Sequence, residues 1–390
     1  MKQFLDILLR SLRSGCLYMA SRRVYLVLMI LVPFAVTWFF LDMMDAGLPL
    51  KTPTAVVDLD QSALSRKITR GLSASQSLDV SYKAESFHDA LKKVRSGEIF
   101  GFFYIPSGFQ SDAVSGKNPT LSYYSNMTYF VPGTLAFKGF KTVAVTTAGG
   151  IVQTTLVSTG VNPAAVGALL QPVAVSEYAI HNPWLNYNIY LTNSFIPGVI
   201  ALMVMFVTAY SICDGIKNGS SVQWLKENGG SMLLALFGRL APQTLVFSAV
   251  GIGCQAIMYG FCHFPLNNHA LHIISAMVLM VIACQGFAVG VCCIIPNLRL
   301  ALSIMSLTGI LTFSIAAFSY PVQSMYGAVG IFSYILPVRY YFLIYVDQAL
   351  NGIPIFYSRW YYVALLLFPL VSLLGLKRLR GRCLHPVYVP

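Results

Sequence analysis

Histidine and cysteine are the side chains of this sequence best suited to metal binding or nucleophilic chemistry. Only His269 and His272, three residues apart, have a spacing that lets two of the six histidines share a metal ion on one helical face. The eight cysteines include no C-x-x-C pair, and Cys292 and Cys293 lack the spacing of a metal site. The sequence also lacks an H-E-x-x-H motif, a Ser/His/Asp set and the phosphate-binding loop G-x-x-x-x-G-K-[ST]. We therefore predict no catalytic residues, no metal site and no bound cofactor, with the His269–His272 pair as the one alternative.

Charged residues are missing from the long apolar segments of the chain. Asp, Glu, Lys and Arg are absent from six segments, at 24–41, 196–212, 241–262, 270–295, 300–318 and 360–376. Proton- and ion-coupled carriers bind their ion on carboxylates or histidines inside the membrane. An ion-driven carrier is therefore disfavoured, and a transporter of this sequence would take its energy from another source.

The composition is that of an integral membrane protein. Hydrophobic residues make up 56% of the chain and charged residues only 10%, too few charges for a soluble protein of this length. The net charge of +12 is concentrated before the first apolar segment and after the last. This distribution is the positive-inside pattern, so it predicts that both termini lie in the cytoplasm. It does not resemble the basic face with exposed aromatic residues that nucleic-acid binding requires.

The six apolar segments and their connections predict the topology. The fold class is an α-helical membrane protein with six transmembrane helices and an α/β domain outside the cytoplasm, inserted between the first and second spans. In residues 1–23, Phe4, Leu5, Leu8, Leu9 and Leu12 share one helical face, which indicates either an amphipathic interfacial helix or a simple basic flank. The predicted parts are residues 1–23, a first span at 24–41, the α/β domain at 42–190, a membrane domain at 191–382 with five further spans at about 196–212, 241–262, 270–295, 300–318 and 360–376, and a tail at 383–390.

The inserted segment alternates strand and helix patterns. We predict strands at 54–59, 78–82, 99–105 and 119–125, and helices that begin near Asp60 or Ser62 and at residue 87, the second ending at Gly97. A long helix at 134–160 and a return segment at 162–188 complete this part.

Two further segments stand out. A polar hairpin, 214–230, follows the second span. Residues 319–358 are broken by prolines, which predicts a segment that either enters the outer leaflet without crossing it or lies on it. In the second segment, Arg339 and Asp347 either pair across two helical turns or are separate interfacial charges.

Several stretches resemble type-2 ABC exporter permeases, in particular the bacterial subgroup with a large external domain after the first span. They are VVDLDQSALSRKITRGL, ALKKVRSGEIFGFFYIPSGF, FSYPVQSM and LPVRYYFLIYVDQALNG. In that family the loop after the second span is a coupling helix that docks on the ATPase, with a pattern close to E-R-E-x-G-T-x-E. Only Gly219 and Ser220 match it here, because the acidic positions hold Ile216, Lys217, Asn218 and Gln223.

The resemblance implies a function and a set of partners. It implies a permease subunit of an ABC exporter that moves a hydrophobic or amphiphilic substrate, in a bacterial inner membrane. ATP and Mg²⁺ would bind to a separate ATPase subunit. The chain would pair with a second permease copy or paralogue, and a periplasmic adaptor is a further partner that the resemblance allows. The alternative is a non-transporting receptor or assembly scaffold with an external ligand-binding domain. The implied ATPase-coupling residues are Lys217, Asn218, Gly219, Ser220, Gln223, Trp224 and Glu227. The implied re-entrant residues are Pro321, Met325, Pro337, Arg339 and Asp347.

Overall fold

The computed structural model describes residues 2–48, 51–160, 162, 165–166, 180–182, 186–316, 318 and 320–386. They belong to two compact units. The helical unit combines Met1–Gly47 with Ala179–Pro390, and the α/β unit is Leu48–Tyr178. Most of the predicted return segment 162–188, the side chain of Phe4 and the last residues of the predicted tail lie outside the described residues.

A four-stranded sheet forms the centre of the α/β unit, with a strand near each of the four predicted positions. The strands are β1 (Thr52–Asp58), β2 (Leu78–Ala84), β3 (Gly101–Ile105) and β4 (Ser122–Ser125). Their order is β2-β1-β3-β4. β1 is parallel to both β2 and β3, and β4 is antiparallel to β3. The sheet is therefore mixed, with helical connections between its parallel strands.

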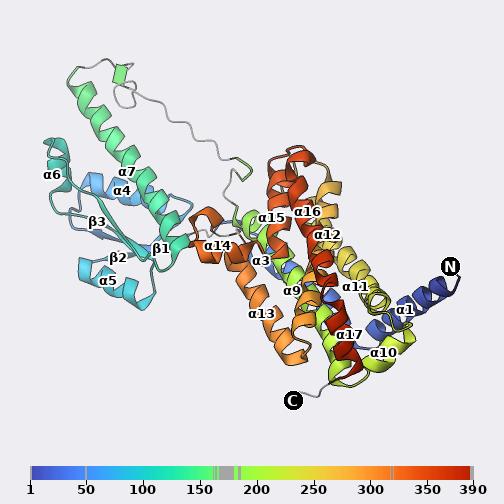
Figure 1. Cartoon of the computed structure of the whole chain (residues 1–390). Helices are drawn as coiled ribbons and strands as arrows, with labels where there is room; N and C mark the ends of the chain where they lie inside the picture. Colours follow the sequence, from blue (N-terminus) through green and yellow to red (C-terminus); the bar gives the residue numbers. More distant parts are fainter. Residues whose placement is uncertain are drawn as a thin grey trace. The chain divides into compact units, whose positions relative to one another are not determined.

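Helices cover both faces of this sheet (Figure 1). They are α4 (Ala63–Ser73), α5 (Phe87–Ser96), α6 (Phe109–Val114) and α7 (Phe130–Ser158). Alternate residues of β1 point to opposite faces, so Val56 packs with α4, α6 and α7, whereas Ala55 and Val57 pack with α5. Of the two predicted caps, Asp60 and Ser62, the Ser62 hydroxyl is the one that caps α4. Gly97, at φ +79°, ends α5, as predicted. The short helix α6 was not predicted.

The described residues of the helical unit contain six helices long and apolar enough to cross a membrane, in agreement with the predicted number. They are Arg23–Met43 (α2, η1 and α3), α9 (Tyr187–Lys217), Met232–Phe261 (α11, Met232–Gln255, with η2, Ala256–Phe261), α12 (Ala270–Ile294), α13 (Leu298–Ile315) and α16 (Ile355–Leu373). Within the first, α2 is Arg23–Leu26, η1 is Val27–Leu31 and α3 is Val32–Met43. Most of these helices extend beyond the predicted spans, and the extensions carry charged residues.

The proline-rich segment is a bent pair of helices. A 3₁₀ turn (η3, Val322–Ser324) precedes α14 (Gly327–Ser333), and α15 (Pro337–Tyr345) continues into η4 (Val346–Leu350). The two arms meet at 82°, the geometry of either a broken span or a re-entrant loop. Pro337 is the first residue of α15, where its missing N–H breaks no helical hydrogen bond.

Three shorter helices gather at one end of the helical unit: α1 (Lys2–Ala20), α10 (Ser221–Glu227) and α17 (Leu376–Leu384). In Figure 1 their labels lie together near the two termini of the chain. Because α10 joins α9 to α11 and α17 follows α16, this end also collects the termini of three long helices.

Candidate functional site

The polar hairpin after the second long helix folds into α10, a helix of seven residues between two glycine turns. Gly219 has φ +70°, and Gly229 and Gly230 have φ +67° and +70°. These left-handed conformations let the chain leave α9 and enter α11 abruptly, at little steric cost for glycine. The hairpin therefore forms a separate short helix and does not continue α9 or α11.

α10 has one buried face and one exposed face. Ser221, Trp224 and Leu225 are buried, whereas Gln223, Lys226 and Glu227 are exposed. Of the residues predicted to contact an ATPase, Lys217, Asn218, Gly219, Ser220, Gln223 and Glu227 are exposed, and Trp224 is buried with only 7% of its surface accessible. Trp224 therefore lies on the buried face of α10 and does not form part of the exposed surface.

The neighbouring helices hold α10 in place through hydrogen bonds. The Ser221 hydroxyl donates to the backbone carbonyl of Cys383 in α17, at 2.8 Å. At the other end of α10, the Asn228 side chain donates to the carbonyl of Trp224 at 2.7 Å and so occupies an acceptor that the ending helix leaves free.

A buried arginine joins α10 to α1 and α11. Arg239 of α11 is 7% exposed, and its guanidinium carbon lies 3.9 Å from the ring centroid of Tyr18 and 4.2 Å from that of Trp224. Its Nη1 donates to the carbonyl of Ser211 in α9, at 2.7 Å. The guanidinium is thus held between two aromatic rings, a geometry that stabilises a cation away from water.

Sequence reasoning missed Arg239. The third span was predicted to begin at 241, but α11 begins at Met232, so Arg239 lies inside a candidate membrane-spanning helix. The absence of charge holds for the predicted segment 241–262 itself but does not extend to the whole of this longer helix. No local signal distinguished Arg239, because Arg299 and Arg359 lie even closer to predicted spans and are exposed, as basic side chains near the ends of spans commonly are.

An ion pair extends the cluster to the end of α9. Arg22 Nη1 lies 2.6 Å from Asp214 Oδ2, and the Tyr18 hydroxyl donates to the same oxygen at 3.2 Å. Burial acts to lower the pKa of Arg22, but the hydrogen bond to Asp214 together with the charge of Asp214 and the nearby tyrosines outweighs it and raises the pKa above its usual value. Burial also raises the pKa of Tyr18, so this phenol stays protonated and can donate. We call Tyr18, Arg22, Asp214, Trp224 and Arg239 the Arg239 cluster.

Small residues bring α1 into direct contact with α11. The Ser11 hydroxyl donates to the carbonyl of Leu234 at 2.9 Å. A side chain at Gly15 would overlap the backbone of Gly238, and one at Gly238 would overlap Ser11. Close approach through Gly and Ser is typical of helices that pack in membranes. On α1 itself, Leu5 and Leu9 are exposed, as an interfacial helix requires.

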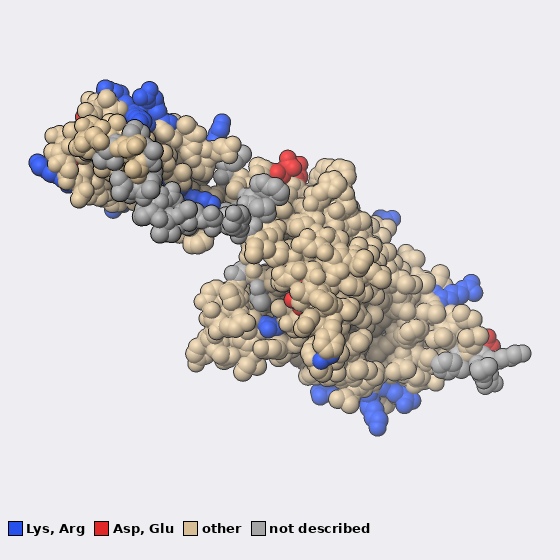
Figure 2. All heavy atoms as spheres, turned by 90° about the horizontal axis from the view of Figure 1, so that it is seen from above, with Lys and Arg blue, Asp and Glu red and all other residues tan. Residues whose placement is uncertain are grey.

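The end of the helical unit around α10 is strongly basic (Figure 2). The exposed acidic residues here are Asp6 and Glu227. The exposed basic residues among those that the structure describes are Arg10, Arg13, Arg23, Lys217, Lys226, Arg299, Lys377, Arg378, Arg380 and Arg382. This surface therefore combines a shaped helix, α10, with a positive field.

A family model described as ABC-2 family transporter protein matches residues 23–376, nearly the whole chain. The chain belongs to the ABC-2 transporter family. It is therefore a multi-pass membrane protein, and its family implies association with an ABC ATPase. No curated protein and no solved structure is significantly similar to the chain.

The bent helix pair of this ABC-2 family protein keeps its charged residues separate. Arg339 is buried, donates to the Ser333 hydroxyl at 2.8 Å and lies 4.4 Å from the Tyr334 ring centroid. Asp347 accepts a hydrogen bond from Ser358 of α16, also at 2.8 Å. The pairing of Arg339 with Asp347, one of the two predicted options, is therefore not observed.

The remaining predicted residues occupy structural positions in this protein. Pro337 is buried at the bend, while Pro321 is exposed and Met325 half-buried at the two ends of η3. Of the two histidines spaced for a metal, His272 forms a hydrogen bond of 2.8 Å with Gln348.

Proposed function

We propose that this protein is the permease subunit of an ABC exporter and that the exposed face of α10 docks on the ATPase subunit. The observation that carries the proposal is the contrast between the two faces of α10. Gln223, Lys226 and Glu227 are free to meet a partner, while Trp224 on the opposite face packs on the Arg239 cluster.

The Arg239 cluster gives such docking a mechanical consequence. A displacement of α10 moves Trp224, which lies against Arg239 of α11. Arg239 in turn lies against Tyr18 of α1, and Tyr18 donates to Asp214 at the end of α9. Packed elements of this kind move as units and do not deform continuously. ATP hydrolysed in the partner would thereby shift two long helices and the surface helix α1 together.

Charge supports the proposed orientation. The basic end that carries α1, α10 and α17 would face the cytoplasm by the positive-inside rule, with both termini there. The α/β unit, inserted between the first and second long helices, would then lie outside the cytoplasm, where it would gate exit or meet a periplasmic adaptor. A bacterial inner membrane is the proposed location.

We further propose that transport uses two permease chains, identical or paralogous, and two ATPase subunits that bind the ATP and Mg²⁺. The chain itself would carry out no catalysis. The apolar surfaces of the long helices favour a hydrophobic or amphiphilic substrate.

The test uses substitutions on the exposed face of α10. A Gln223→Ala, Lys226→Ala, Glu227→Ala triple variant removes no buried contact, so the protein should insert and fold normally. We expect the ATPase that co-purifies with the tagged wild-type chain to be lost or strongly reduced. The matched control replaces three exposed residues of the α/β unit, Lys92, Arg95 and Lys117, with alanine and should retain the ATPase.

Two results would count against the proposal. Undiminished ATPase recovery with the α10 variant would place the docking surface elsewhere. A wild-type chain that brings down no ATPase even after crosslinking would favour a receptor or scaffold.

A further inference from the structure

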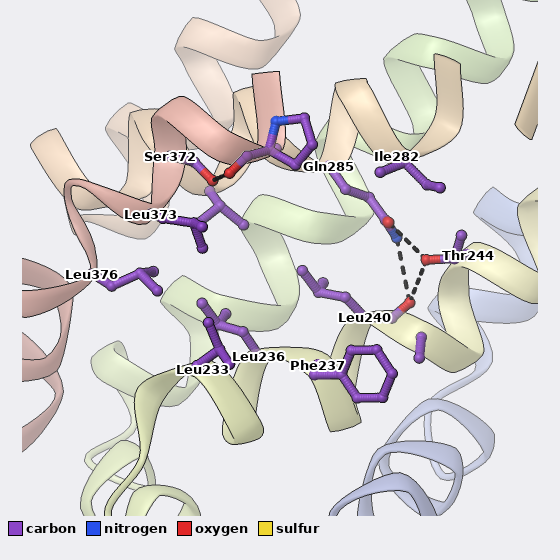
Figure 3. A pocket seen from close by; sticks show the side chains of 14 residues that line it. Leu233, Leu236, Phe237, Leu240, Thr244, Ile282, Gln285, Ser372, Leu373 and Leu376 are labelled. Carbon is purple, nitrogen blue, oxygen red and sulfur yellow. Dashed lines mark hydrogen bonds between the residues drawn. The ribbon is translucent and has the colours of Figure 1, made fainter. Parts of the chain in front are cut away.

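An elongated apolar pocket lies between α11, α12, α16 and the start of α17 (Figure 3). Its volume is about 350 Å³, within the range of roughly 300–1,000 Å³ that small-molecule sites occupy. The lining residues of α11 run from Leu233 to Thr244, a rise of about 16 Å along the helix axis. The pocket is therefore a slot parallel to the long helices, the shape that an acyl chain fills.

Three polar side chains interrupt the apolar wall. Ser372 of α16 donates its hydroxyl to the carbonyl of Pro369 at 2.7 Å, and Thr244 and Gln285 lie at the end of the slot farther from α17. The Thr244 hydroxyl lies 2.7 Å from Gln285 Oε1 and 2.9 Å from the carbonyl of Leu240, so these two acceptors share its single proton. The Gln285 amide nitrogen donates to the same Leu240 carbonyl at 3.4 Å. Figure 3 shows the two side chains facing each other from α11 and α12. Since these groups satisfy one another, they do not demand a polar ligand, and the slot remains suited to a hydrocarbon chain.

The slot opens towards the membrane. Among its lining residues, Leu233 and Phe237 of α11 are 54% and 52% exposed, and Leu373 of α16 is 45% exposed. These side chains belong to helices that span the bilayer, so lipid surrounds the opening. A ligand would enter sideways from the hydrocarbon.

An unpaired cation lies where the slot reaches the membrane surface. Arg380 follows the lining residue Leu376 by one turn of α17, and its guanidinium lies beside Gly230, just before Leu233 begins the opposite wall. Arg380 is exposed, and none of the three ion pairs formed among the described residues includes it. Basic side chains next to pockets between membrane helices are suited to anionic lipid headgroups.

We propose that this pocket binds one chain of an anionic phospholipid whose headgroup, net negative because no cationic group balances its phosphate, lies against Arg380. The chain fills the slot between α11 and α16, and the headgroup lies between Gly230 and α17. The site is separate from the exposed face of α10, and lipid binding here does not depend on the ATPase or on the direction of transport.

The test uses the full chain in nanodiscs that contain phosphatidylglycerol with a photoreactive group on its acyl chain. After irradiation, peptide mapping should find crosslinks in 233–244 and 282–289 above the level at the exposed face of α13 around Leu307, which reports bulk lipid. Phosphatidylcholine with the same chain should label the pocket less.

Two substitutions locate the headgroup. Arg380→Gln should lower pocket labelling by phosphatidylglycerol about fivefold, the effect of about 1 kcal/mol per basic residue near a membrane surface, and leave phosphatidylcholine labelling unchanged. Arg382→Gln removes the same charge two residues along α17 and should have little effect. Leu240→Trp should fill the slot and abolish pocket labelling by both lipids.

The proposal is overturned if pocket labelling does not exceed that of α13, or if Arg380→Gln and Arg382→Gln behave alike. Equal labelling by the two lipids would show a chain site without anion recognition and would also overturn it. Since both arginine variants alter only exposed side chains, they decide the question even if Leu240→Trp fails to fold.

Discussion

Replacement of Arg239 by methionine tests whether the Arg239 cluster holds α1 and α10 on the long helices. Methionine keeps most of the side-chain volume but loses the charge, the hydrogen bond to Ser211 and both ring contacts. A hydrogen bond from a charged group contributes about 1.5–3 kcal/mol. Each cation–π contact contributes about 0.5–2 kcal/mol.

The favourable interaction free energy that is lost is therefore about 2.5–7 kcal/mol. Removal of a buried charge also removes its desolvation cost, which is several kcal/mol. We expect a net loss of about 1–3 kcal/mol, confined to the docking of α1 and α10, which corresponds to roughly 5- to 150-fold faster local opening. Hydrogen exchange with mass spectrometry measures this opening peptide by peptide. Peptides from 5–20 and 221–228 should exchange faster, while those of α12 should not change.

Two controls make the result specific. Arg359→Met also removes an arginine stacked on an aromatic ring, since the guanidinium carbon of Arg359 lies 3.8 Å from the Phe356 ring centroid, but Arg359 is exposed at the first turn of α16. It should leave α1 and α10 unchanged. Arg239→Lys keeps a charge without the planar guanidinium, so α1 and α10 should exchange at rates closer to those of Arg239→Met than to those of the wild type. Unchanged exchange of α1 and α10 in Arg239→Met would refute the reasoning.

Two further predictions concern α1 and α17. Gly238→Ala places a methyl group against Ser11 and should weaken the packing of α1 on α11 by about 1–3 kcal/mol, which tryptic digestion would report as faster cleavage after Arg10 and Arg13. In the control Gly260→Ala, the added methyl group meets no atom within 4 Å, so cleavage should stay at the wild-type rate. Equal cleavage of the two variants would contradict the close contact between α1 and α11. Cys383 is fully buried and its pKa is raised to about 12 by burial, so at pH 7.5 a maleimide should modify the exposed Cys16 and spare Cys383 until the protein is denatured. Peptide mass spectrometry measures both sites, and equal labelling in the folded protein would contradict the packing of α17.

Local patterns were sufficient for most elements of the fold. Six apolar segments without charges predicted six long helices, because a span must be long and apolar whatever it packs against. Ser62 and Gly97 marked helix ends through their own backbone and side-chain chemistry. The four strands followed from short β-branched and aromatic stretches, but their order and the direction of β4 depend on pairing between residues far apart in the chain.

The sequence by itself determined that this is a membrane protein, where the apolar part of each long helix lies, and that a polar hairpin separates the second long helix from the third. Composition and apolar length decide these features, and both are local properties. Only the tertiary structure decided that Trp224 points inward while Gln223 and Glu227 point outward, because α10 is too short for its own pattern to select a face. It also decided the partners of Arg239, since Tyr18, Ser211 and Trp224 come from three other helices and meet only when α1, α9, α10 and α11 pack together.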